Sequence, residues 1–264
     1  MTKVFLIRVG MDTTYGGFVS PIFPDKSYVF VPIPNARTGN IQIDDYSDNL
    51  KTYSEVKTNS DAPLTDYLPK DKIDLNGDII EDIGNLKVHN DPEFETMTYG
   101  EKKDKRIWHE LKHFKEGDYI VFYATFYPCP HGFKYKDYTL SELRSLQQNN
   151  KQYYIFAYLK LKYPPIDRNN YRKYEDEIQN NAHYLRGDFE KHDKSFILKG
   201  TDDSGWIKPI DMGATKKGSN YYMSKKMASY KLDNQDKRGL NRCYCRLKED
   251  IIPMLLKNKL HYSR

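Results

Sequence analysis

The loop DTTYGG, residues 12–17, holds the first group of residues that could do chemistry. It combines an acid, three hydroxyl groups and two glycines: Asp12, Thr13, Thr14, Tyr15, Gly16 and Gly17. Adjacent glycines let backbone N–H groups converge on an anion, and the hydroxyl groups add hydrogen-bond donors. The acid could act as a base, as a metal ligand or as an acceptor for the edge of a nucleobase. The alternative is an ordinary turn in which these side chains bond to nearby backbone groups.

A second group lies in the stretch VHNDPEFE, residues 88–95. A histidine, an amide and three acids fall close together there: His89, Asn90, Asp91, Glu93 and Glu95. A histidine beside carboxylates can form a general acid–base pair or a metal site. Asn-Asp-Pro is also a common turn sequence, so this stretch could simply begin a new element. We name Asp12, His89 and Asp91 as the candidate catalytic residues.

The same region allows a nuclease interpretation. An acid followed by Glu-x-Lys can hold Mg²⁺ and activate water, so Asp91 could act with Glu101 and Lys103. Against this, residues 101–105 are expected to form the exposed first turn of a helix.

The stretch GATKKGSNYYMSKKMASYKL, residues 213–232, is rich in lysine and tyrosine and contains no acid. Lysine contacts phosphate and aromatic side chains contact bases in nucleic-acid recognition. The alternative is a solvated basic loop. We predict nucleic-acid binding by Lys216, Lys217, Tyr221, Tyr222, Lys225 and Lys226, and by Trp206 of the nearby turn TDDSGW. Such a tryptophan could stack on a base, although tryptophans more often cover the edge of a core.

Two further groups give weaker signals. The spacing of His183, Arg186, Asp188, His192 and Asp193 is too loose for a metal motif. Cysteines at positions 129, 243 and 245 could meet a histidine at 131 on one zinc ion, but the usual Cys-x-x-Cys pair is absent. Buried thiols are the default for such cysteines, so no metal site is predicted.

Several apolar runs predict strands. They cover residues 3–9, 27–34, 119–127, 152–162, 195–200 and 205–210. Helices are predicted over 99–114, 139–150, 170–185 and 248–260, with Thr139 or Ser141 as the cap of the second and Pro253 limiting the last. Strands and helices without regular alternation favour an α+β fold with a mixed sheet. The succession of elements over residues 108–162 is similar to PUA/EVE-like modules, which are small, partly closed barrels.

Four motifs in order carry a second resemblance. They are DTTYGG after the first strand, FVPIP at the end of the second, HNDPEF before a helix and EGDYIVFYATFY after it. Together they resemble the nucleotide modification associated domain 3 family, over about residues 3–162 and more weakly to about 200. The resemblance implies a role in DNA base modification or its recognition, in a prokaryote or phage. It implies no particular reaction.

Composition limits the remaining possibilities. The net charge is +5, but residues 183–264 hold 18 Lys and Arg against 10 Asp and Glu, so the basic character is concentrated there. A basic excess fits contact with a polyanion. The sequence contains no run of 18 apolar residues, so no membrane span is predicted. Three cysteines are a sparse and odd set, which favours a reducing, cytoplasmic setting.

These observations lead to one expectation for the whole chain. We expect a single domain over residues 1–264, with a family-like core over about 3–200 and a basic part over 201–264. The protein would engage a DNA base in a restriction or modification system. The base would lie in a pocket of Thr13, Thr14, Tyr15, Gly16, Gly17, Tyr123 and Phe126, in a cleft shared with the His89–Asp91 corner. A non-catalytic reader of modified bases and a Mg²⁺-dependent nuclease are the alternatives. The sequence does not specify a cofactor or an oligomeric state.

Overall fold

The computed structural model describes residues 1–10, 17–35, 49–56, 58–59, 62–70, 83–102, 106–191, 195–232, 240 and 244–260. The chain forms two compact units, and each is built from separate stretches of sequence. Unit 1 comprises residues 1–9, 91–124 and 153–264, and unit 2 comprises residues 10–90 and 125–152. The sequence-based expectation of a single domain with a basic C-terminal part stays a prediction, because a domain can contain more than one compact unit.

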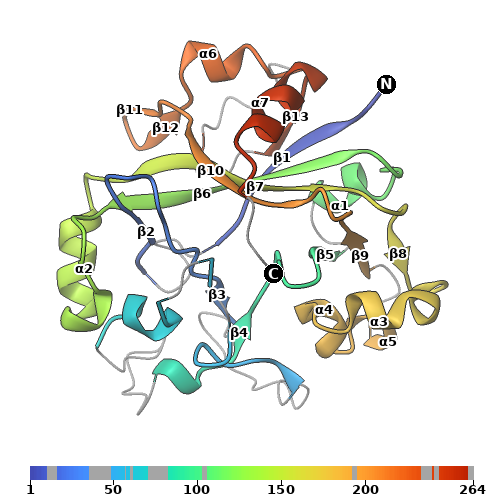
Figure 1. Cartoon of the computed structure of the whole chain (residues 1–264), viewed down its shortest axis with the longest axis horizontal. Coiled ribbons are helices and arrows are strands. Elements are labelled where there is room, and N and C mark those ends of the chain that lie inside the picture. Colours follow the sequence, from blue (N-terminus) through green and yellow to red (C-terminus); the bar gives the residue numbers. More distant parts are fainter. Residues whose placement is uncertain are drawn as a thin grey trace. The chain divides into compact units, whose positions relative to one another are not determined.

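The main sheet of unit 1 is mixed. Its strand order is β10–β7–β6–β1–β13, which Figure 1 shows in the upper half of the view. The five strands are β1 (Val4–Arg8), β6 (Tyr119–Pro128), β7 (Gln152–Lys160), β10 (Gly205–Asp211) and β13 (Tyr244–Leu247). Strand β1 is parallel to β6 and antiparallel to β13. Its residues 4–7 are about 1% exposed, as the unbroken apolar run predicts for a strand covered on both faces.

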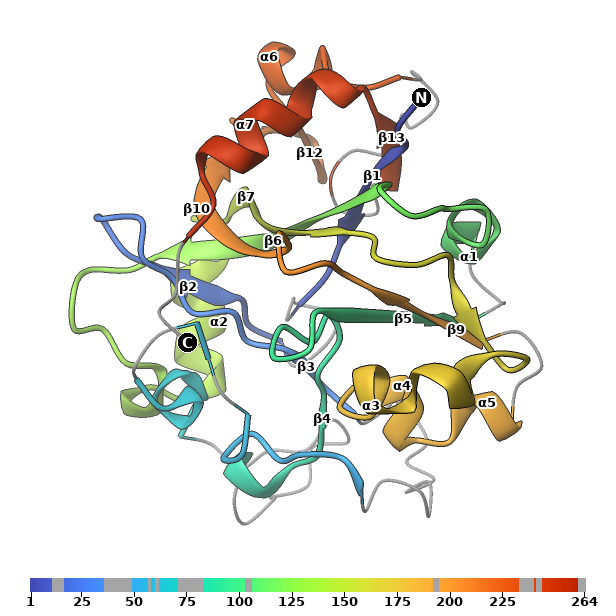
Figure 2. The ribbon, with the colours of Figure 1, turned by 45° about the vertical axis from the view of Figure 1, so that its right-hand side comes forward.

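One face of this sheet packs against the C-terminal part of the chain. Helix α7 (Ile252–Lys257), preceded by the 3-10 turn η7 (Glu249–Ile251), buries Leu255 and Ile251 in a core with Val121, Ile155 and Ile207. Figure 2 shows α7 above β10. The backbone N–H of Lys208 donates to Asn258 O at 2.7 Å, which joins the end of the helix to the strand. Pro253 lies in the first turn of α7, as predicted, where its missing N–H costs nothing.

A smaller sheet forms the other part of unit 1. Its order is β5–β9–β8, and both pairings are antiparallel. The strands are β5 (Thr98–Lys102), β8 (Ile166–Asp167) and β9 (Ser195–Lys199). Three one-turn helices gather beside it in Figure 1: α3 (Glu175–Ile178), α4 (Ala182–Leu185) and α5 (Asp188–Lys191). They bury Ile178 and Phe189 against Ile166 and Ile197.

The remaining elements of unit 1 are short. They are α1 (Arg106–Leu111), the 3-10 helix η5 (Tyr171–Tyr174), the hairpin strands β11 (Thr215–Lys217) and β12 (Asn220–Tyr222), and α6 (Lys225–Ala228). Within the described ranges, every helix is too short or too polar to cross a membrane.

Unit 2 has less regular structure around its own aromatic core. Its elements are β2 (Ser20–Ile22), β3 (Ile33–Pro34), η2 (Leu64–Tyr67), η3 (Ile83–Asn85), β4 (Val88–His89), η4 (Tyr135–Asp137) and α2 (Leu140–Gln147). Strand β2 is parallel to the last residues of β6, and β3 is antiparallel to β4. The Tyr135 hydroxyl donates to Val19 O at 2.7 Å and Val19 N donates to Gln147 Oε1 at 2.8 Å, so buried polar groups tie the core together.

Three predicted elements are wrong in extent. The helix expected over 99–114 is strand β5 followed by the shorter α1, because residues 98–102 pair with β9. The strand expected over 27–34 reduces to β3. The surface helix expected over 170–185 is broken into η5, α3 and α4. In each case pairing or packing with distant residues overrides the local preference.

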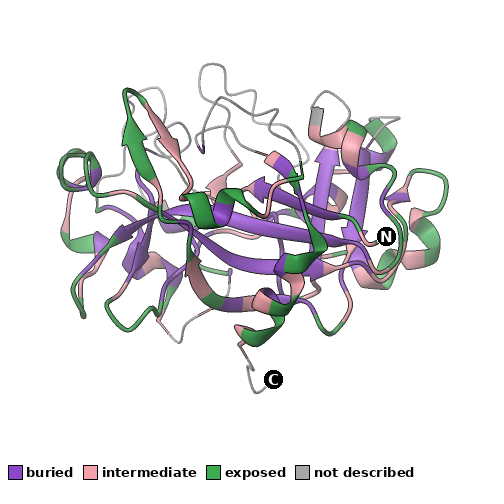
Figure 3. Ribbon diagram, turned by 90° about the horizontal axis from the view of Figure 1, so that it is seen from above, coloured by how far each residue is buried: buried purple, intermediate pink, exposed green. Residues whose placement is uncertain are grey.

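The α+β class with a mixed sheet is confirmed. The order of the main sheet has two ends, at β10 and β13, so the described strands form no closed barrel. Buried residues, purple in Figure 3, follow the strands. The PUA/EVE-like resemblance stays a prediction.

The structure resolves which residue caps α2. Thr139 accepts a hydrogen bond from Glu142 N at 3.1 Å, and Glu142 reaches back to Thr139 N at 2.7 Å. We expect Thr139→Ala to lower the free energy of unfolding by about 1 kcal/mol in denaturant titrations. The alternative cap, Ser141, is exposed inside the helix, so Ser141→Ala is the matched control and should change stability little. Equal losses in both variants would contradict this assignment.

Candidate functional site

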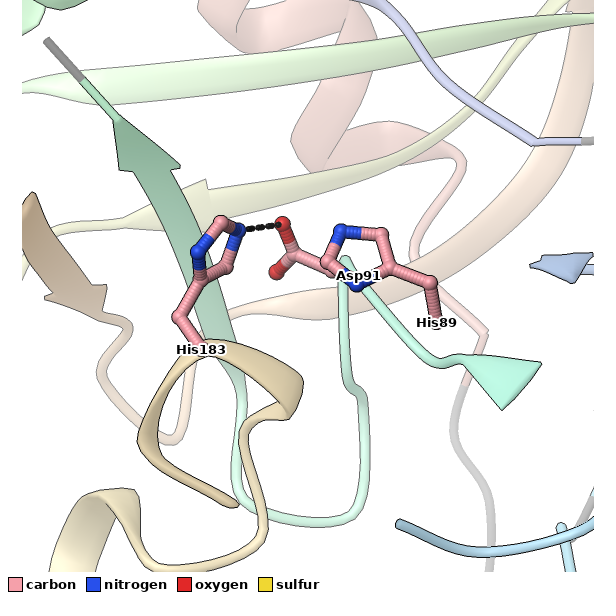
Figure 4. Close-up of side chains that lie close together, drawn as sticks. All are labelled: His89, Asp91 and His183. Atoms are coloured by element: carbon pink, nitrogen blue, oxygen red, sulfur yellow. Dashed lines mark ion pairs between the residues drawn. The ribbon is translucent and has the colours of Figure 1, made fainter. Parts of the chain in front are cut away.

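A buried histidine with a carboxylate on each side lies in unit 1. His183 Nδ1 is 2.8 Å from Asp188 Oδ2, and His183 Nε2 is 3.4 Å from Asp91 Oδ2. All three side chains are at least nine-tenths buried. Figure 4 shows the ring of His183, from α4, pointing toward Asp91, from the loop that precedes β5. His89, which the same figure draws, belongs to unit 2.

The amide of Asn181 fixes the position of this histidine. Asn181 is the N-cap of α4 and accepts a hydrogen bond from His183 N at 2.9 Å. Its Nδ2 donates to Asp91 Oδ1 at 3.2 Å and to Thr98 Oγ1 at 3.0 Å. One buried side chain therefore starts the helix that carries His183 and also holds the carboxylate that His183 faces.

Gly100 gives the imidazole its space. The N–H of Gly100, in the middle of β5, donates to Asp91 Oδ1 at 2.8 Å. A Cβ atom at this position would lie well under 3.0 Å from the His183 ring. The glycine is required by this close approach and not by its backbone angles, because its φ is not positive.

The electrostatics of the network favour a charged histidine. Burial disfavours the imidazolium, but hydrogen bonds to Asp188 and Asp91 outweigh burial and raise the pKa of His183. Burial also opposes the Asp188 carboxylate, yet the hydrogen bond from His183 and the charges of Arg186 and Lys102 lower its pKa. Lys102 Nζ lies 3.0 Å from Asp188 Oδ1.

Two more buried acids lie along the same hairpin. Glu93 accepts hydrogen bonds from the backbone of Glu95 and Thr96, which closes the turn before β5. Burial is the main reason that the pKa of Glu93 is raised. Glu101, which was expected in an exposed helical turn, is instead 3% exposed in β5 and accepts from the Tyr99 hydroxyl at 2.9 Å. Both glutamates therefore have structural partners.

The network can hold and pass a proton, because an imidazole between two carboxylates takes one up without leaving a lone buried charge. Asp91 Oδ2 and His183 Nε2 are also the kinds of atoms that bind a metal ion. Sequence reasoning names Asp91 as a candidate and His183 with Asp188 only as a weaker group, and it does not predict that these three side chains meet. The signal available was the cap sequence NNAHYL, in which an asparagine precedes a short helix.

Of the other candidate catalytic and loop residues, the structure describes only Gly17 and His89. Asp12, Thr13, Thr14, Tyr15 and Gly16 lie outside the described residues. Gly17 is buried with a φ of +84°, and its carbonyl accepts from Arg144 Nε at 3.3 Å. His89 is half-buried at the end of β4, opposite Ile33. The expected cleft between the loop and the His89–Asp91 corner stays a prediction.

Tyr123 and Phe126 do not line an open pocket in this structure. Both are 0% exposed. The Tyr123 hydroxyl donates to Leu240 O at 2.9 Å inside unit 1, and the Phe126 ring packs edge-on against Tyr28 inside unit 2. Residues of a central strand are covered on both faces, which is why these aromatic side chains serve the cores and not a surface.

The lysines predicted to bind nucleic acid fall on one short segment of unit 1. Lys216 and Lys217 are exposed on β11, and Lys225 and Lys226 are exposed on α6. The hairpin turns at Gly218, whose φ is +60°, because a tight two-residue connection favours this conformation. Met227 is buried and anchors α6 to the core. Within the described ranges, none of these four lysines forms an ion pair.

The aromatic residues of this prediction are half-buried. The Tyr221 ring centroid lies 5.2 Å from that of Tyr153. Tyr222 is also half-buried, opposite Thr215. Trp206 is not at the tip of a turn but in β10, with its ring 3.9 Å from that of Phe94. It therefore covers a core edge, as many tryptophans do.

The weaker groups give mixed outcomes. His183 and Asp188 meet, and Arg186 Nη2 lies 3.8 Å from Asp188 Oδ1. His192, Asp193 and Cys243, and also Lys103 of the nuclease interpretation, lie outside the described residues. Cys129 and Cys245 are buried thiols, and burial raises the pKa of Cys129 to about 12.

The fold and these sites define an α+β protein with a buried acid–histidine network and a basic hairpin. The chain belongs to the nucleotide modification associated domain 3 family, whose model matches residues 3–248. The match confirms the resemblance and extends it beyond the motifs that suggested it. The family description associates the chain with nucleotide modification. Comparison with curated proteins and with solved structures gives no match.

A double-mutant cycle tests the close packing of Gly100 on His183. We expect Gly100→Ala to lower the free energy of unfolding by about 2 kcal/mol, because the added methyl group overlaps the ring. In a His183→Ala background the same change should cost clearly less. Denaturant titration of the four proteins measures the coupling. An equal cost in both backgrounds would show that the ring is not the cause.

The raised pKa of His183 predicts a pH dependence of stability. Its stabilising contribution is complete below the unfolded pKa of about 6.5 and is lost as the pH rises through the folded pKa. The difference in melting temperature between the wild type and His183→Gln should therefore be larger at pH 6 than at pH 9. His109→Gln, at an exposed histidine of the same unit, is the control. Parallel pH profiles for the wild type and His183→Gln would contradict the assignment.

Proposed function

We propose that this protein acts on or recognises DNA in a base-modification or restriction system. The single observation that supports DNA contact is the cluster of four exposed lysines on β11 and α6, for which the described residues supply no counter-charge. A phosphate backbone supplies one negative charge per nucleotide, so it is the partner that suits such a surface. The membership of the nucleotide modification associated domain 3 family supports the context.

The shape of this surface suits a duplex or a single strand. Lys216 lies opposite Tyr221 and Lys217 opposite Asn220, so cations on β11 are paired with hydrogen-bonding side chains on β12 in a short two-stranded ribbon. A two-stranded ribbon fits the major groove of DNA. The exposed lysines would contact phosphates. The half-exposed edges of Tyr221 and Tyr222 would contact bases or sugars.

The base itself would be engaged by the candidate acid–base residues Asp12, His89 and Asp91, together with the loop at residues 13–17. Chemistry on a base requires that it leave the stack, and a polar loop could receive it. Within unit 1 the support comes from Asp91, which lies against a histidine with a raised pKa. Tyr123 and Phe126 are not part of this proposal, because both are fully buried.

A non-catalytic reader of modified bases is the second candidate function. The burial of both Asp91 and His183 favours it, because their hydrogen-bonding atoms already have partners inside the protein. In this case the network would hold the structure of a binding surface. Incubation of the protein with modified and unmodified DNA, followed by mass spectrometry of the nucleosides, separates the two candidates.

The Mg²⁺-dependent nuclease is the least favoured alternative. It needs a carboxylate of Glu101 that is open to a metal ion and to water. That carboxylate instead accepts hydrogen bonds from the Tyr99 hydroxyl and from Lys102 N inside the small sheet. A reducing, cytoplasmic compartment remains the expected setting for each of the three functions.

The salt dependence of DNA binding tests the lysine surface. The wild type should bind duplex DNA, and its affinity should fall steeply with salt. We expect Lys216→Gln/Lys217→Gln to weaken binding about tenfold at low salt and to reduce the slope of log K against log salt by about 2. Mobility-shift titrations at several salt concentrations, with modified and unmodified duplexes, measure both quantities.

A charge-matched variant controls for net charge. Arg172 and Lys173 are exposed on η5, away from the lysine-rich segment in sequence, so Arg172→Gln/Lys173→Gln removes the same charge. Its effect on affinity should be much smaller. Equal losses in both variants, or salt-insensitive binding by the wild type, would refute DNA contact at the hairpin.

A further inference from the structure

Unit 1 contains a cavity that the proposed function does not use. Its volume is about 780 Å³, within the usual range for small-molecule sites. It lies between α1, the segment that follows α1, and the start of β9. Six residues carry the argument that follows: Lys3, Trp108, Lys112, Lys115, Ser195 and Phe196.

The wall of this cavity is aromatic. The ring centroids of Trp108 and Phe196 are 6.2 Å apart, and the two rings are within 30° of parallel. Trp108 is half-exposed, whereas Phe196 is 2% exposed behind it. An indole packed against a second ring is a firm platform on which a planar ligand such as a nucleobase can stack.

The rim of the cavity carries cations. Lys112 Nζ lies 4.8 Å from the centre of the Trp108 ring, and Lys3 Nζ lies 5.6 Å from the centre of the Phe114 ring. Lys115 is exposed beside them. Three lysines outnumber the two acids of the lining, Glu116 and Asp167. The lining therefore attracts an anion. Lys112, which is exposed on a flexible side chain, can turn from the indole toward that anion.

Two polar groups of the lining have no partner. Trp108 Nε1 and Ser195 Oγ are both buried, and neither forms a hydrogen bond in the part of the chain that the structure describes. Ser195 as a whole is 2% exposed. Buried polar groups nearly always have partners, so two orphans at one cavity call for an explanation. A ligand that displaces Lys112 and offers an acceptor and a donor would satisfy both.

We propose that this cavity binds a nucleotide. The base would stack on Trp108, the phosphate would lie among Lys112, Lys115 and Lys3, and Trp108 Nε1 and Ser195 Oγ would hydrogen-bond the ligand. The same chemistry is found in a free nucleoside monophosphate and in one unit of a single strand of DNA. The site is separate from the lysine-rich hairpin and does not depend on the proposed function.

Binding to the full-length protein tests this site. The probes are deoxyadenosine 5′-monophosphate, deoxyadenosine, and an oligo-dA of about eight nucleotides. Their binding is measured by calorimetry and by the quenching of tryptophan fluorescence. We expect saturable binding of the monophosphate, with deoxyadenosine binding about tenfold more weakly because it lacks the charge. Lys112→Gln/Lys115→Gln should weaken the monophosphate about tenfold and the nucleoside little. Both lysines are exposed, so this variant should fold.

Further variants locate the ligand. Trp108→Phe should abolish the quenching, since the other tryptophan is Trp206 in β10, and Ser195→Ala should weaken binding severalfold. Lys216→Gln/Lys217→Gln is the control and should leave the affinity for the monophosphate unchanged. Binding of oligo-dA alone, weakened by Lys112→Gln/Lys115→Gln, would support the site with a DNA strand as its source.

Three outcomes would overturn the proposal. They are no binding of any probe, binding that Lys112→Gln/Lys115→Gln leaves unchanged, and equal weakening by the hairpin variant. The failure of this site and the failure of the proposed function are distinguishable, because duplex binding at the hairpin and nucleotide binding at the cavity respond to different lysine pairs.

Discussion

The pairing of His183 with Asp91 and Asp188 is the interaction on which the smaller sheet of unit 1 and its neighbouring helices depend. Its members come from the turn before β5, from α4 and from α5, so one imidazole joins a sheet to two helices. Each of these helices is a single turn, too short to be stable alone. Removing one partner from a buried charged pair typically costs about 3–5 kcal/mol, because the other charge stays buried.

The same constraint explains the neighbouring sequence. Asn181 must supply both a cap and an amide donor, and position 100 can carry no side chain. Lys102 and Arg186 then balance the remaining charge of Asp188. Polar residues in a core are tolerated only when every member has partners. Together these residues make the region rigid, which is what an acid–base site or a binding surface needs from its support.

Local patterns predicted the long strands and the class of the fold. The apolar runs at β1, β6, β7 and β9 are recognisable because each strand is buried along nearly its whole length, and β10 is recognisable although only Gly205 and Ile207 of it are buried. The capping box of α2 was visible as Thr-x-x-Glu. The sequence predicts a helix over 99–114, and the charges from residue 101 onward suit its first turn. The pairing of residues 98–102 with β9, almost a hundred positions later, is not encoded locally.

In the candidate site, too, local features are predictable from the sequence and contacts between distant residues are not. Asp91 and the lysines could be recognised by residue type, whereas the meeting of Asp91 with His183 depends on how three distant stretches fold together. The burial of Tyr123 could not be read from its type, because an aromatic strand predicts an open wall and a covered core equally well.

One pairing in the main sheet has a consequence for biosynthesis. Strand β1 lies between β6 and β13, so its hydrogen bonding is complete only after residues 244–247 have been synthesised. Contacts so distant in sequence make folding slow. Until residues 244–247 are in place, the edge of β1 that faces β13 has unpaired backbone N–H and C=O groups, and unpaired strand edges favour aggregation.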